Sequence, residues 1–258
     1  MSAAPRKFDG RGLLVPAGLL VLAELAFWVT GMQSDSLAPP SRVLVAGVNA
    51  LADGSLILGT AQTLGSALVG VTIGFSFGLG VGIVLGMFRF LDRLLEVAIE
   101  TIRPVPAIAL FPIALLVFGF GYRMEFAIVA FASVWPALIL SRAAVASVEP
   151  RLFEIARLLQ LGFFARTYKI VLPAALPRIV VALRLTVGLA LIMAVTIEIS
   201  SNTIGLGNAM MQAQASLDPA RMLAFLVWIG IVGWTLNALM LAAQKRIFGS
   251  ILSGEAQL

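Results

Sequence analysis

Residues 62–88 read QTLGSALVGVTIGFSFGLGVGIVLGMF and contain no charged side chain. Roughly 20 apolar residues in an α-helix cross the hydrocarbon core of a membrane, so this run predicts a transmembrane helix. Glycine recurs at every fourth position of its second half and forms one stripe along the helix, which allows another helix of this chain or of a second copy to approach closely. A role in letting helices slide is the alternative. The stripe consists of Gly70, Gly74, Gly78, Gly82 and Gly86.

Five more apolar runs of similar length lie along the chain. With 60% hydrophobic and 12% charged residues, the 258-residue chain is far less charged than a soluble domain, in which roughly a quarter of the residues are charged. The sequence therefore predicts an all-α, polytopic membrane bundle of six transmembrane helices. We interpret the first run as a retained helix rather than a cleaved signal, because Glu24 interrupts it and no small-residue cleavage site follows. The other runs are Leu13–Gly31, Val105–Gly121, Glu125–Val145, Ile179–Ile199 and Met222–Ala243.

The basic residues indicate how these helices are oriented. With a cytoplasmic N-terminus and six crossings, every lysine and arginine except Arg42, Arg123 and Arg221 falls on or near the inner side. Cytoplasmic loops of membrane proteins carry such an excess of positive charge. We expect both termini to be cytoplasmic, and we expect a bacterial inner membrane with its lipid, rather than nucleic acid, to account for the net charge of +5.

Several kinds of chemistry lack the residues that they need. The chain has no cysteine and no histidine, which excludes a disulfide framework and makes a zinc site or a thiol or imidazole nucleophile unavailable. It also has no glycine-rich phosphate loop that ends in Gly-Lys-Ser or Gly-Lys-Thr. We expect no metal and no cofactor on this chain, no catalytic residues and no enzymatic activity.

Prolines mark the start of the third apolar run. Arg103-Pro104-Val105-Pro106 opens it and Pro112 lies inside it. Proline lacks an amide donor and collides with the preceding helical turn, so we expect this helix to begin late and to be kinked. A kinked helix could line a cavity, and a plain turn is the alternative.

A long segment separates the fourth and fifth runs. Residues 147–178 read SVEPRLFEIARLLQLGFFARTYKIVLPAALPR. Pro150 suits a first helical position, Gly162 a helix end, and Pro173 the end of a second short helix. Two short helices joined at a glycine would form a projecting knob, whereas the alternative is an amphipathic helix lying on anionic lipid.

A carboxylate lies deep in the fifth run. Glu198 is about 21 Å along a helix from Arg184, in the outer half of the bilayer, where an ionisable group usually faces a cavity, a partner or a pathway. The following residues are too polar to face lipid and suggest a broken or re-entrant segment at an outer gate. An interfacial Glu198 bonded to the next backbone groups is equally compatible. The candidate residues of the translocation path or gate are Glu198, Asn202, Gly205 and Gly207.

The segment between the fourth and fifth runs resembles the cytoplasmic EAA loop of binding-protein-dependent ABC importer permeases. Glu154-Ile155-Ala156, then Gly162, then Leu172-Pro173 follow that pattern, although Ile155 replaces an alanine. Further likenesses are Leu37 to Ser41, Arg103 to Pro106, Phe118 to Gly121 and Gly205 to Gly207, which extend the resemblance over roughly residues 37–246. The permeases for aliphatic sulfonates, taurine and nitrate are the most similar.

The resemblance implies a function and a set of partners. The chain would have the type I ABC importer permease fold and form the translocation path for a small, polar, anionic solute. A cytoplasmic ABC ATPase would bind ATP and magnesium, a periplasmic protein would deliver the solute, and a second permease copy would complete a homodimer. The knob would dock on the ATPase, with Leu158, Leu159 and Leu161 as its buried face. The coupling residues would be Glu154, Ala156, Arg157, Gly162, Leu172 and Pro173.

The expected organisation has one core and short flanks. Residues 1–36 hold the N-terminus and first helix, 37–55 an outer segment with a possible short interfacial helix, 56–246 the permease core with the loop 147–178, and 247–258 a cytoplasmic tail. The rival reading is a secondary transporter or channel, which would leave the knob without a purpose and would be expected to show an inverted repeat that we do not see. A membrane-embedded enzyme would need a catalytic constellation that is missing.

Overall fold

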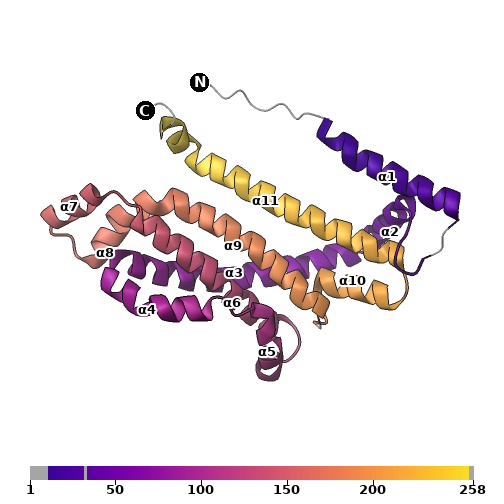
Figure 1. The fold of residues 1–258 in the computed structure, drawn as a ribbon, viewed down its shortest axis with the longest axis horizontal. Helices are drawn as coiled ribbons and strands as arrows, with labels where there is room; N and C mark the ends of the chain where they lie inside the picture. The colour runs from indigo at the N-terminus through magenta and orange to yellow at the C-terminus, as the bar shows by residue number, and fades with distance from the viewer. Residues whose placement is uncertain (1–10, 32–33, 201, 256–258) are drawn as a thin grey trace.

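The computed structural model describes residues 11–31, 34–200 and 202–255. Expectations that concern Arg6, Lys7, Ser201 and the last three residues lie outside this part. All regular structure in the described part is helical, and four helices are long and apolar enough to cross a membrane. The helices run side by side as an elongated bundle (Figure 1). The all-α membrane bundle predicted from the sequence is therefore confirmed.

Three of the long helices form the core of the bundle: α3 (Ser55–Met87), α6 (Tyr122–Ala146) and α9 (Leu172–Ser200). Their facing side chains are small or β-branched, and Val129, Ala137 and Ala194 are fully buried. The outward faces stay apolar, as expected for surfaces that meet lipid, with Phe77 64% and Ile192 61% exposed.

The glycine stripe of α3 lies against α6 of the same chain. A Cβ added at Gly78 would lie 2.5 Å from the carbonyl oxygen of Val134 and 2.8 Å from the Cβ of Ala137. The other four glycines also approach α6 this closely. The close packing expected of the stripe is therefore found within one chain, and a role in letting helices slide stays a prediction.

The remaining long helix and two N-terminal helices cover one side of the core. The long helix α11 (Pro219–Glu255) packs on α9 and α2 (Pro40–Ala52), and it continues past the expected core boundary at residue 246. The first helix α1 (Arg11–Thr30) contacts α2, where Glu24 accepts hydrogen bonds from the backbone amide (3.0 Å) and hydroxyl (2.7 Å) of Ser41. Among the helices in the described part, α1 is apolar but shorter than the four long ones.

The third expected run, Val105–Gly121, forms a short helical segment that is bent away from the helix before it. Its residues form the 3₁₀-helix η1 (Ala107–Leu110) and α5 (Phe111–Phe118), and together these meet the preceding helix α4 (Arg89–Ile102) at 76°. Pro112 lies at the start of α5 and does not kink a helix interior, because a proline there gives up an amide that has no helical partner. The described chain thus has four long spans, or five if this bent pair counts as one, and the count of six is approximate.

Short helices lie at the two ends of the bundle. At one end are α7 (Pro150–Leu158), α8 (Phe163–Arg166) and the π-helix η2 (Thr167–Val171), and at the other are α2 and α10 (Gly205–Ala215) (Figure 1). The expectation of an isolated second helix ending at Pro173 was wrong, because α8, η2 and α9 follow one another without a break. Pro173 lies directly after the π-helix η2, inside this continuous helical run rather than at its end.

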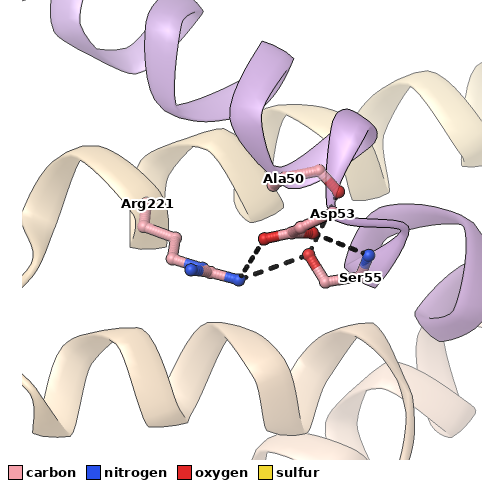
Figure 2. A network of polar contacts seen from close by, with 4 residues as sticks. All are labelled: Ala50, Asp53, Ser55 and Arg221. Carbon is pink, nitrogen blue, oxygen red and sulfur yellow. Dashed lines mark hydrogen bonds and ion pairs between the residues drawn. The ribbon is translucent and has the colours of Figure 1, made fainter.

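A polar network joins α2, α3 and α11 at the α10 end (Figure 2). The guanidinium of Arg221 lies 3.0 Å from the Asp53 carboxylate, which also accepts a 2.9 Å hydrogen bond from the Ser55 amide. The Ser55 hydroxyl donates to the Ala50 carbonyl at 3.1 Å. These contacts close the turn between α2 and α3 and attach it to the first turn of α11.

Candidate functional site

The chain breaks between α9 and α10, and side chains from other elements hold the new helix start. The first amides of a helix have no partner within it. Here the amide of Gly205 donates to Gln62 Oε1, that of Leu206 to Thr63 Oγ1 and that of Gly207 to Glu198 Oε2, each at 2.9 Å. Three side chains from α3 and α9 therefore cap α10.

Glu198 occupies the space between the two helices at this break. Its side chain is 1% exposed, and Oε2 also accepts a 3.0 Å hydrogen bond from the Thr63 hydroxyl. Gly205 has φ +89° and lies against this carboxyl group, so a Cβ there would collide with it. A Cβ at Gly207 would lie 2.7 Å from both Glu198 Cβ and the Val195 carbonyl oxygen. Both glycines are thus required for the close approach of α10 to α9.

A second buried carboxylate, Glu125, lies beside Glu198. Glu125 is 0% exposed in the first turn of α6 and accepts a 2.8 Å hydrogen bond from Asn202 Nδ2. The carbonyl oxygen of the same Asn202 side chain accepts a 2.9 Å hydrogen bond from the Gly121 amide. Asn202, 3% exposed, therefore connects the break to the start of α6.

The structure brings together all four residues that the sequence assigned to a path or gate: Glu198, Asn202, Gly205 and Gly207. Their contacts are with the protein, and whether they take part in transport stays a prediction. Sequence reasoning missed Gln62, Thr63 and Glu125. A weak signal existed, since these residues are polar or acidic within or at the start of apolar runs, but their partners lie up to 143 residues away in sequence.

The α7–α8 loop lies at the opposite end of the bundle. Ala156 is fully buried, whereas Leu158 is 83% and Phe164 85% exposed. The expected buried face of the knob is therefore exposed within this chain, at least at Leu158 and Leu159. Such large apolar side chains on a short loop mark a surface for a partner.

The turn of this loop differs from the expected one. Gln160, with φ +51°, ends α7, whereas Gly162 has φ −64° and precedes α8 as its extended N-cap residue. A Cβ at Gly162 would meet nothing within 4 Å. The fold of this chain therefore does not by itself require glycine at position 162.

A polar cavity of about 610 Å³ lies behind the loop, between α7, α8 and the adjoining ends of α3 and α6. Arg142 forms ion pairs with Asp92 at 2.7 Å and with Glu96 at 3.6 Å, which tie α6 to α4. The expected coupling residues Glu154 and Arg157 line this cavity. Leu172 and Pro173 begin α9 and join the loop to the core. The other charged residues lining the cavity are Arg89 and Arg166.

A family model for the inner membrane component of binding-protein-dependent transport systems matches residues 70–251. The matched part runs from within α3 into α11 and includes both the α7–α8 loop and the α9–α10 break. The matched part therefore contains both regions described above, the loop and the break.

Relatives and solved structures agree with this match. SsuC of Bacillus subtilis strain 168, named as a permease for aliphatic sulfonates, is 24% identical over 95% of this chain and 91% of its own length. SsuC of Escherichia coli K12 is 30% identical over 85% of this chain and 83% of its own length. An inward-facing structure of the MetNI methionine ABC transporter matches 75% of this chain and 94% of the solved chain, with a TM-score of 0.65 and 22% identity.

Proposed function

The chain belongs to the family of binding-protein-dependent transport system inner membrane components and is the permease subunit of an ABC importer, and we propose that its solute is a small polar anion of the sulfonate, taurine or nitrate kind. ATP is bound and hydrolysed on partner ATPase subunits, and this chain contributes no catalytic residue. A periplasmic protein delivers the solute, two copies of the permease form a homodimer, and both termini of each copy face the cytoplasm of the bacterial cell.

The observation that carries the proposal is the exposed apolar surface of the α7–α8 loop. Leu158 and Phe164 flank the turn at 83% and 85% exposure, although burial of one such side chain is worth about 1.5–3 kcal/mol. A partner that covers them recovers this free energy. The ATPase of the importer is the partner that we assign to the loop, with Glu154 and Arg157 available for charged contacts.

The helix that follows the loop connects it to the far end of the bundle. The chain is helical without interruption from Phe163 to Ser200, through α8, η2 and α9. A helix advances 1.5 Å per residue, so this element reaches across the whole bilayer. Movement of the loop when the ATPases close is thus transmitted along α9 to Glu198 and α10, and the outer gate changes state.

The charge of the solute is supported by two observations. The two SsuC relatives are named for aliphatic sulfonates, which are anions. In this chain, Arg184 lines a groove of about 270 Å³ between α9 and α11, whose other lining side chains are mostly apolar. Arg184 has no ion pair in the described part of the chain, and an unpaired guanidinium inside a membrane bundle is suited to attract an anion.

Reconstitution tests this function. The permease and its ATPase are placed in vesicles, and ATP hydrolysis and solute uptake are measured against a panel of loaded binding proteins. We expect uptake only with ATP, and stimulation of hydrolysis only by a binding protein that carries an anion. Uptake without ATP would support the rival secondary transporter, and stimulation only by cationic or neutral cargo would contradict the anionic solute.

A further inference from the structure

Two carboxyl groups from different helices meet inside the protein at the α9–α10 break. Glu125 of α6 is 0% exposed and Glu198 of α9 is 1% exposed. The two carboxyl groups lie close enough to interact electrostatically, and the neutral hydroxyl of the buried Ser66 lies beside Glu125. Each carboxyl has one oxygen engaged elsewhere, since Glu125 Oε2 accepts from Asn202 and Glu198 Oε2 accepts from Thr63 and Gly207.

The remaining oxygen of each carboxyl group has no donor. Glu125 Oε1 and Glu198 Oε1 are both buried without a hydrogen-bond partner from another described group. A buried oxygen left in this way costs about 1–3 kcal/mol, and more if it is charged. Two ionised carboxylates in contact would add like-charge repulsion in a low-dielectric interior.

No cation of the described chain compensates for the pair. The packed helices α3 and α10 contain no charged residue, and the cations of α9, Arg178 and Arg184, lie far toward its other end. On α6 the neighbouring cation is Arg123, which is exposed and has no ion pair in the described part. Only neutral donors therefore face the two carboxyl groups.

We propose that Glu125 and Glu198 form a proton-binding site in which one proton lies between Glu125 Oε1 and Glu198 Oε1. A single proton removes one negative charge and supplies a donor that serves both orphan oxygens. Paired carboxyl groups that share one proton are a known solution to this arrangement. The site joins α6 to the α9–α10 break through a hydrogen bond between charged and neutral partners, which is stronger than one between neutral groups.

The surroundings assign the proton to Glu125. Glu198 Oε2 accepts two hydrogen bonds and lies at the N-terminus of α10, where the helix dipole favours negative charge. Glu125 Oε2 accepts the hydrogen bond from Asn202, and the Ser66 hydroxyl lies beside the Glu125 carboxyl group, but no backbone amide in the described part of the chain donates to that group. Glu125 is therefore the protonated donor and Glu198 the carboxylate acceptor.

Infrared spectroscopy of the permease–ATPase complex in vesicles at pH 7 tests the site directly. A protonated carboxylic acid has a carbonyl stretch separate from that of carboxylates, and exposed acids are ionised at this pH. We expect the difference spectrum of wild type minus Glu125→Gln to contain this band, with a downshift in D₂O. The matched control is Glu100→Gln, which removes an exposed carboxylate of α4 and should leave the band unchanged.

Two further results decide the proposal. Glu125→Gln should keep the thermal midpoint of the wild type within a few degrees, because the amide still donates to Glu198, whereas Glu125→Ala should lower it clearly. A band that is absent from the wild type, or unchanged in Glu125→Gln, would overturn the site, as would a monovalent cation that must be present for the wild-type midpoint. The infrared result does not depend on the solute, so its failure is distinguishable from failure of the proposed function.

Discussion

The backbone amide of Gly207 donates a 2.9 Å hydrogen bond to Oε2 of Glu198, nine residues earlier in the chain. This bond spans the break between α9 and α10 and holds the start of α10 against the last turns of α9. Gln62 and Thr63 cap the two preceding amides. Specific side chains therefore hold the break, the α9–α10 junction, in place. Changes to these residues should affect the outer end of the permease selectively.

Gly207→Ala should destabilise the junction. Its Cβ would lie 2.7 Å from Glu198 Cβ and from the Val195 carbonyl oxygen, and backbone cannot yield as a flexible side chain can. Overpacking of this kind costs about 1–3 kcal/mol, so the thermal midpoint of the purified permease should fall by several degrees. Gly188→Ala is the control, because nothing lies within 4 Å of its Cβ. Equal midpoints for the two variants would contradict the close approach.

Thr63→Val should weaken the same junction by removing a hydroxyl while keeping the shape. The hydroxyl accepts from the Leu206 amide and donates to Glu198, and the residue is fully buried. Leaving those groups unpaired should cost about 1–3 kcal/mol. Thr72→Val is the matched control, since its hydroxyl bonds only the Leu68 carbonyl of its own helix. Denaturation of both variants, followed by tryptophan fluorescence, should show the loss in Thr63→Val alone.

Gly78→Ala should destabilise the contact between α3 and α6 within one chain. The added methyl group would lie 2.5 Å from the Val134 carbonyl oxygen. Gly80→Ala, two residues away and with nothing within 4 Å, should be neutral or slightly stabilising, because alanine favours a helix by about 0.5–1 kcal/mol. Thermal midpoints of the isolated permease make the comparison. If Gly78→Ala changed only the association of copies and left the midpoint intact, the stripe would instead be an intermolecular surface.

Gly162→Asp should abolish ATP-coupled uptake and leave the fold intact. The position is open, with nothing within 4 Å, and aspartate is a favourable residue before the first turn of α8. Any loss of coupling then arises outside this chain, at the ATPase. Binding of the ATPase to permease vesicles and the thermal midpoint are measured together, with Ser216→Asp at the other end of the bundle as the exposed control. Wild-type uptake by Gly162→Asp would remove the loop turn from coupling.

Asp53 should give the outer turn an acid-dependent contribution to stability. The side chain and backbone amide of Ser55, together with the Arg221 guanidinium, lower the pKa of Asp53. Since the folded pKa lies below the unfolded one of about 3.9, the stabilisation is present above that pH and is lost as the pH falls through the folded pKa. Asp53→Asn should therefore lower the thermal midpoint at neutral pH. Below pH 4, the midpoint of this variant should fall less steeply with pH than that of the wild type. A double-mutant cycle with Arg221→Ala measures the coupling, which should be small for so exposed a pair.

The membrane bundle and the candidate loop could be predicted because their signals are local. Apolar runs such as residues 62–88 and the positions of prolines indicate the structure of the few helical turns around them. The same local signals failed where packing decides: Pro173 was expected to end a helix that continues into α9, and Gly162 to provide a turn that Gln160 provides. The break at 76° between α4 and α5 was likewise not visible in hydropathy.

By itself, the sequence determined that the chain lies in a membrane and that its apolar segments are helical, since water–lipid transfer acts on each segment separately. It singled out Glu198 but left a deep and an interfacial position open. Only the tertiary structure decided what Glu198 contacts. Thr63 is 135 residues from it, and Asn202 reaches Glu125 across 77 residues. Pairing across such distances depends on how the helices pack, and the close approach permitted by the glycines of α3 and α10 brings these polar groups together.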